Sequence, residues 1–169
     1  MVEPLADWVI ERIGQAAELY HRLVMLVAPA GSGKTVALQE VHKRTAAPLV
    51  NVNLELSRGM LDLTSRQRAL QLPRLLAEIV GASTADVVLL DNLEVLFDVS
   101  LKQDPLRLLQ GLSRNKTVVA AWSGSIDGEY VVYATPDHPE YKRYLLRDFL
   151  YVCASKVERK TSGEICGED

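Results

Sequence analysis

Cysteine, long apolar runs and basic charge are all scarce in this sequence. Cys153 and Cys166 are the two cysteines among 169 residues, and their spacing excludes a cysteine-ligated metal site. We expect one buried and one exposed thiol in a reducing compartment. No apolar run is long enough to span a membrane, and the N-terminus lacks the basic-then-apolar pattern of a signal peptide. These absences predict a soluble, cytoplasmic protein without a membrane partner.

The net charge and the length narrow the class of protein further. The formal net charge is −3, so no overall basic field attracts nucleic acid. Apolar residues make up 48% of the chain, and its length suits one α/β domain with a substantial core. No internal repeat or low-complexity block interrupts the sequence. We expect a core over residues 1–152 and a polar, disordered tail over residues 153–169.

The most informative segment is a loop of small residues that follows an apolar run and opens onto a helical pattern. Glycines at 31 and 33 allow backbone N–H groups to turn inward toward an anion. The following helix adds the positive end of its dipole. Lys34 suits the β- and γ-phosphates of a nucleotide, and the Thr35 hydroxyl suits Mg²⁺. The predicted phosphate-binding loop consists of Ala28, Pro29, Ala30, Gly31, Ser32, Gly33, Lys34 and Thr35.

One position departs from the usual G-x-x-x-x-G-K-[ST] pattern, because Ala28 replaces the first glycine. If the backbone at this position needs a positive φ, alanine is mildly strained there. The alternative interpretation is a glycine-rich turn between a strand and a helix that binds nothing. The apolar run before the loop and the helix after it favour the nucleotide-binding interpretation.

Strand and helix patterns alternate along the chain, which predicts a mainly parallel sheet covered on both faces. Pro73 is expected to begin a helix that Gly81 ends, and Asp104 and Pro105 to begin another. The expected fold class is therefore α/β, a three-layer P-loop sandwich. Helices are expected over residues 3–21, 34–44, 54–81 (interrupted) and 104–113, and strands over residues 22–28, 49–53, 87–91, 117–122, 130–133 and 144–152.

Asp91 is the second predicted metal-binding residue, because it ends an apolar strand at its carboxyl end. The interval between Lys34 and Asp91 is typical of P-loop ATPases in which another strand separates the loop strand from the aspartate strand. The alternative is a turn aspartate at the end of an ordinary strand. Thr35 and Asp91 together form the expected Mg²⁺ site.

The base that activates water is harder to locate, because Asn92 follows Asp91 where many such ATPases have glutamate. Glu94 is close in sequence, and Glu55 follows the second expected strand. Either residue is a candidate base, and either is equally a surface or capping carboxylate. The choice stays open, and slow or assembly-dependent turnover follows from it.

Three other residues are candidates for contact with the γ-phosphate. Ser123 ends the fourth expected strand, where such ATPases often place a polar residue, but a turn serine is the equal alternative. Arg107 and Arg114 lie seven residues apart on one helix face. Arg114 or Arg107 can serve as an arginine finger toward a neighbouring subunit, or simply form a structural ion pair. GTP-reading motifs are incomplete, which favours ATP.

Five segments in and around these motifs carry a resemblance to a known family: residues 20–24, 51–57, 90–97, 104–114 and 119–124. In order and in spacing they are similar to BrxF, the small P-loop proteins of type 3 bacteriophage exclusion (BREX) systems, which are related to AAA+ ATPases. The resemblance implies an ATPase in prokaryotic antiviral defence, with ATP and Mg²⁺ at the loop and Asp91. It covers roughly residues 15–150, nearly the whole expected core.

The resemblance also implies partners. No C-terminal helical lid is evident, so a bare ATPase core is expected to act as a homo-oligomer or with other BREX proteins. DNA is a candidate partner because of the family's setting, although net acidity argues against strong binding by the monomer. Two other interpretations stay open: a small P-loop kinase, and a non-catalytic module whose assembly is gated by nucleotide.

Overall fold

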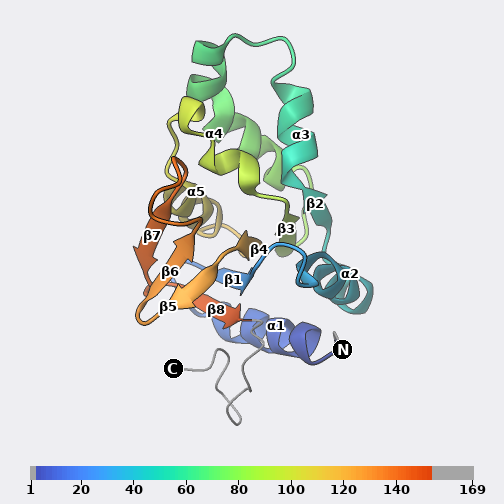
Figure 1. Cartoon of the computed structure of the whole chain (residues 1–169). Helices are drawn as coiled ribbons and strands as arrows, with labels where there is room; N and C mark the ends of the chain where they lie inside the picture. Colours follow the sequence, from blue (N-terminus) through green and yellow to red (C-terminus); the bar gives the residue numbers. More distant parts are fainter. Residues whose placement is uncertain (1–2, 154–169) are drawn as a thin grey trace.

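A five-stranded sheet, parallel throughout, forms the centre of the molecule (Figure 1). The computed structural model describes residues 3–153. The sheet order is β2-β3-β4-β1-β8, so β4 separates the loop strand β1 from the aspartate strand β3, as the sequence predicts. The strands are β1 (Leu23–Ala28), β2 (Leu49–Asn51), β3 (Val87–Asp91), β4 (Thr117–Ser123) and β8 (Leu150–Cys153).

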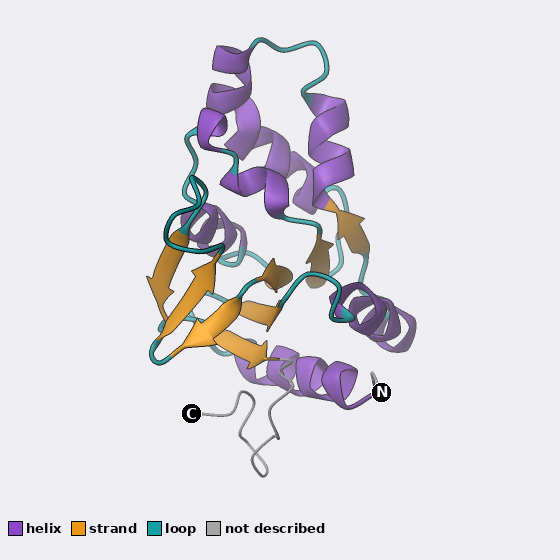
Figure 2. Ribbon diagram, in the orientation of Figure 1, coloured by secondary structure: helices purple, strands orange, loops and turns teal. Residues whose placement is uncertain are grey.

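Both faces of the sheet are buried, which explains why its strands are almost continuously apolar. Alternate residues of β1 point to opposite faces: Met25 packs into one core cluster and Leu26 into the other. Helices α1 and α2 cover the face of Leu26, and α3, α4 and α5 cover the face of Met25 (Figure 2). The predicted three-layer α/β sandwich is therefore confirmed.

The helices begin and end mostly where their capping residues predict. Asp104 caps α5, with Pro105 in its first turn, and Thr64 forms a capping box with Gln67 at the start of α4. The first helix was expected to extend to residue 21, but it ends at Ala16. The helices are α1 (Glu3–Ala16), α2 (Lys34–Thr45), α3 (Val52–Gly59), α4 (Ser65–Gly81) and α5 (Pro105–Leu112), with short 3₁₀ helices η1 (Glu94–Phe97) and η2 (Val99–Leu101).

Pro73 does not begin a helix, so this prediction is wrong. It lies inside α4, where a proline has no N–H to donate to the carbonyl four residues earlier. That carbonyl belongs to Ala69, and it accepts a hydrogen bond of 2.8 Å from Nε2 of Gln103. Because a distant side chain replaces the missing backbone donor, α4 continues through the proline to Gly81.

A second, antiparallel sheet is attached at the end of β4. Its strands are β5 (Ser125–Asp127), β6 (Tyr130–Tyr133) and β7 (Lys142–Leu145), in the order β5-β6-β7. The single strand expected over residues 144–152 is therefore wrong, since the chain leaves the small sheet after Leu145 and enters the large one at Leu150. The hydroxyl of Tyr144 donates to Asp104 at 2.7 Å and ties the small sheet to the start of α5.

Two expectations drawn from composition concern the state of the cysteines and the absence of a membrane-spanning segment. Cys153 is 7% exposed, but it is disulfide-bonded, so the expectation of a buried free thiol is wrong. Cys166 and the predicted tail after Cys153 lie outside the described residues. Within residues 3–153, no helix combines the length and the apolar character that crossing a membrane requires.

Candidate nucleotide-binding site

The predicted phosphate loop joins β1 to α2 at the carboxyl edge of the large sheet (Figure 2). Gly31 and Gly33 have φ values of +80° and +92°, which is the left-handed region that favours glycine. Ala28 belongs to β1, where it pairs with Ser123, and its φ angle is not positive. Alanine is therefore unstrained where the motif usually has glycine.

Lys34 is the first residue of α2, and its side chain folds back into the loop. Its Nζ donates to the carbonyl oxygens of Ala28 at 3.0 Å and Pro29 at 2.9 Å. Only 7% of the residue is exposed. Burial lowers the pKa of Lys34, and the nearby charges of Glu94 and Asp91 partly oppose that shift. The ammonium group is thus held in a poorly hydrated site between the loop and two carboxylates.

Thr35 and Asp91, the two predicted metal ligands, are in direct contact. The Thr35 hydroxyl donates to Oδ2 of Asp91 at 2.6 Å, and the other carboxylate oxygen accepts from the backbone N–H of Asn92 at 2.9 Å. Hydroxyl and carboxylate oxygens are the ligands that Mg²⁺ prefers, with phosphate and water completing its octahedron. No cluster of three or more acidic, histidine or cysteine side chains suited to a metal occurs within residues 3–153. The pair therefore fits a magnesium ion that phosphate oxygens help to bind.

Glu94 and Ser123 are also brought together, although they follow different strands. The Ser123 hydroxyl donates to Oε2 of Glu94 at 2.7 Å. Ser123 ends β4 beside the loop, and the carboxylate of Glu94 is close enough to Lys34 to influence its pKa. Glu94 is therefore at the phosphate end of the site, exposed to solvent, as a candidate base needs to be.

Glu55 lies elsewhere. It is on α3, where it pairs with Arg58 at 3.4 Å, and it lines a hollow of about 450 Å³ along β2 together with Leu75 and Glu78. It is not among the charges that shift the pKa of Lys34. Of the two candidate bases, the geometry favours Glu94.

The two arginine candidates also lie away from the loop of their own chain. Arg107 is exposed on α5, beside a hollow of about 320 Å³ between α4 and α5. Arg114 lies over the ring of Tyr20 at 5.2 Å, just before β4 begins. Since β1 and β4 are parallel, Arg114 is at the amino edge of the sheet and the phosphate loop at the carboxyl edge. An arginine finger at Arg114 would have to serve a neighbouring chain, and this role stays a prediction.

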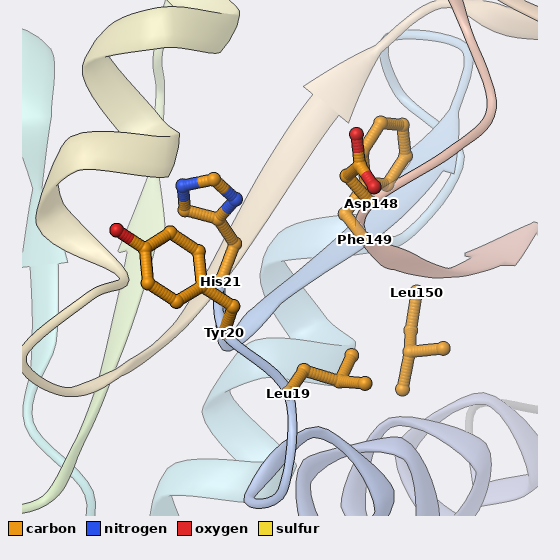
Figure 3. A pocket seen from close by; sticks show the side chains of 6 residues that line it. All are labelled: Leu19, Tyr20, His21, Asp148, Phe149 and Leu150. Carbon is orange, nitrogen blue, oxygen red and sulfur yellow. The ribbon is translucent and has the colours of Figure 1, made fainter.

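A hollow of about 570 Å³ adjoins Tyr20 at the amino edge of the sheet (Figure 3). Its walls come from the segments that precede β1 and β8. Figure 3 shows Tyr20 and His21 on one side and Asp148 with Phe149 on the other. This hollow is separate from the phosphate loop, because the loop leaves β1 at the opposite end.

Sequence reasoning missed Gly124, which supports the phosphate loop from the side. Its backbone N–H donates to the carbonyl oxygen of Ala28 at 3.0 Å, so this oxygen accepts from both Gly124 and Lys34. A lone glycine after a strand is an ordinary turn signal. The contact arises only because β4 and β1 are neighbours in the sheet.

The strand order and the loop geometry define a P-loop α/β sandwich. No protein-family model and no curated protein matches the chain. Among solved structures, the chain is similar in fold to C. elegans PCH-2, with 13% sequence identity and a TM-score of 0.41. The match covers 90% of this chain and 42% of the PCH-2 chain, so this chain spans less than half of that protein's length.

Proposed function

We propose that this protein is an AAA+-like ATPase that binds ATP with Mg²⁺. The contact between Thr35 and Asp91, 2.6 Å long, is the observation that carries the proposal. A glycine-rich turn that binds nothing does not explain why a loop hydroxyl contacts a buried carboxylate 56 residues away in the sequence. The same contact is useful in a nucleotide site, because a hydroxyl and a carboxylate are the protein ligands that a phosphate-bound Mg²⁺ requires.

Each part of the loop has a separate task in this proposal. The backbone N–H groups around Gly31 and Gly33 bind phosphate oxygens, and the N-terminus of α2 adds a favourable dipole. Lys34 exchanges its two carbonyl partners for oxygens of the β- and γ-phosphates. Magnesium, when bound, neutralises charge on the same phosphates. Thr35 and Asp91 are the residues that would hold it.

Glu94 is the proposed base, which accepts a proton from the attacking water at its carboxylate oxygen. In the present arrangement that carboxylate accepts from Ser123 instead. Water activation therefore requires Glu94 to share or release this hydrogen bond. Asn92 cannot act as a base, so slow turnover, or turnover that needs an assembly, follows from the same geometry.

The wider setting of the proposal comes from the resemblance to BrxF. In this proposal the protein is a cytoplasmic component of a BREX-type antiviral system. It forms a homo-oligomer, works with other proteins of that system, and couples nucleotide use to assembly or to DNA-directed defence. An arginine from a neighbouring copy, with Arg114 as the candidate, would complete the site in such an assembly.

The test is ATP binding and hydrolysis across a range of protein concentrations, with molecular mass recorded in each nucleotide state. Lys34→Ala should abolish binding. Lys43→Ala, an exposed lysine on the same helix, is the matched control and should behave like the natural protein. Turnover per subunit that rises with concentration supports an active site shared between copies. Absence of ATP binding in the natural protein refutes the proposal.

A second candidate is a module that binds ATP and assembles without hydrolysing it. Asn92, in the position after Asp91, is the observation that favours it. Tight ATP binding and a change of mass without phosphate release would support this function. Glu94→Gln then discriminates between the candidates, because it should stop turnover in an ATPase and change nothing in a purely assembling module.

A further inference from the structure

Three aromatic rings pack together, and two of them come from the elements that carry Glu94 and Ser123. Phe97 stacks on Tyr133 with ring centroids 3.6 Å apart and planes 11° apart, and it makes a T-shaped contact with Trp122, with centroids 5.1 Å apart. Trp122 and Tyr133 are in edge contact at 6.2 Å. All three are largely buried, since their exposed fractions are 3%, 1% and 9% for Phe97, Trp122 and Tyr133. Such a cluster holds its members in a fixed geometry.

Two members of this cluster are attached to the two catalytic candidates. Glu94 begins the 3₁₀ helix η1 and Phe97 ends it, so both belong to one turn. Ser123 directly follows Trp122 on β4. The ring contact between Phe97 and Trp122 joins η1 to the end of β4, so it helps to fix the distance between Glu94 and Ser123.

Tyr133, the third member, comes from the small antiparallel sheet. The strand that carries it is fixed to β4 by a hydrogen bond of 3.3 Å from Nε1 of Trp122 to the carbonyl oxygen of Val132. Burial raises the pKa of Tyr133 to about 12, and the negative charges of Glu94 and Glu140 act in the same direction. The phenol is thus neutral at physiological pH and close to the carboxylate of Glu94.

We infer that Tyr133 is a positioning residue for Glu94. By stacking on Phe97, it holds η1 in the orientation that brings the carboxylate of Glu94 to Ser123 and to the phosphate end of the site. The small sheet β5–β7 thereby becomes part of the catalytic apparatus. This inference rests on the proposed ATPase function, but the geometric part can be tested without nucleotide.

The first experiment compares crystal structures of two variants without nucleotide. Tyr133→Phe keeps the stacked ring and should keep the hydrogen bond between Ser123 and Glu94. Tyr133→Leu removes the ring and should displace η1 and break this bond. Tyr130→Leu is the matched control, because Tyr130 is on the same strand but on its other face, under Arg143 at 3.5 Å. An intact bond in Tyr133→Leu overturns the inference.

The second experiment is ATPase kinetics on the same variants. A 1 Å misplacement of a catalytic group lowers the rate by roughly a hundredfold, so Tyr133→Leu should lower kcat by roughly ten- to a hundredfold. KM should change little, because the loop and Asp91 are untouched. Tyr133→Phe should restore the natural kcat. Equal losses in both variants, or a loss confined to KM, overturn the inference.

The outcomes separate this inference from the proposed function. If the natural protein does not bind or hydrolyse ATP, the proposed function fails, while the crystal structures still decide whether Tyr133 positions Glu94. If Tyr133→Leu does not fold, Tyr133→Met replaces it. Methionine also lacks a planar ring, and its flexible side chain fills the gap left by the ring better than leucine does. The same displacement of η1 is then expected, and its absence refutes the inference.

Discussion

Gly124→Ala should strongly destabilise the protein, because β6 passes directly over this glycine. A Cβ atom at position 124 would lie 1.9 Å from the carbonyl oxygen of Val132 and 3.0 Å from Nε1 of Trp122. The first distance is far inside van der Waals contact, and the obstacle is backbone. The small sheet must therefore move away from the end of β4 by about 1 Å or more, since packed interiors have no spare volume to absorb the extra atom.

The expected magnitude follows from what this movement disrupts. Overpacking costs roughly 1–3 kcal/mol, and loss of the bond between Trp122 and Val132 adds about 1 kcal/mol. The free energy of unfolding should therefore fall by roughly 2–4 kcal/mol, which lowers the melting temperature by roughly 5–15 °C for a chain of this length. Weaker ATP binding should accompany the loss, because strain at position 124 also shifts the backbone N–H that donates to the Ala28 carbonyl.

Urea unfolding followed by tryptophan fluorescence measures this difference. Gly14→Ala is the control: it is on α1, and a Cβ there has no neighbour within 4 Å. That variant should be as stable as the natural protein or up to about 1 kcal/mol more stable, since alanine favours helix. If the free energy of unfolding of Gly124→Ala is within about 0.5 kcal/mol of that of the natural protein, the close approach of β6 does not exclude a side chain at position 124, and the prediction is refuted.

Three further predictions concern the loop and α4. Thr35→Val should weaken ATP binding in Mg²⁺ by roughly tenfold or more but change little in EDTA, because it removes one metal ligand beside Asp91; equal losses in both conditions, measured by calorimetry, would contradict this. Lys34→Met should raise the melting temperature of the nucleotide-free protein at pH 7, because burial lowers the pKa of Lys34 and so disfavours its charged form in the folded state. The difference in melting temperature between the two proteins should narrow as the pH rises from the lowered pKa of Lys34 toward 10.5, because Lys34 then becomes neutral in the folded natural protein. A difference that widens over this range would contradict the prediction. Gln103→Ala should lower the free energy of unfolding by roughly 1–3 kcal/mol, because the carbonyl of Ala69 loses its donor, and an unchanged urea midpoint would show that water replaces it.

The sequence was sufficient for features that depend on neighbouring residues. The loop, the strand that ends at Asp91 and the cap at Asp104 are each written in a few consecutive positions. Their chemistry and their period are local, so the elements and the layer order could be predicted. The contact of Thr35 with Asp91 followed as well, because parallel strands bring their carboxyl ends to one edge.

What failed depends on contacts between distant segments. The continuation of α4 through Pro73 requires Gln103, which is thirty residues away, and no local pattern reveals that partner. In the sequence, β8 resembles a continuation of β7, but β7 pairs with β6 in the small sheet and β8 pairs with β1 in the large one. The choice of Glu94 over Glu55 likewise needed the position of Ser123. Helix and strand propensities carry no information about such pairings.

If the protein is the proposed ATPase, the buried ammonium group of Lys34 should influence which anions it binds. Folding has already stripped most water from this cation, and two carbonyl dipoles stand in for its hydration shell. In the proposed site, a polyphosphate would therefore meet a charge that carbonyl groups rather than water solvate, in a medium of low polarity where attraction is stronger than at an exposed lysine. A small anion that cannot span from Lys34 to the loop N–H groups would gain only one of these two sets of contacts. The proposed ATPase should therefore bind long phosphate chains more tightly than small anions.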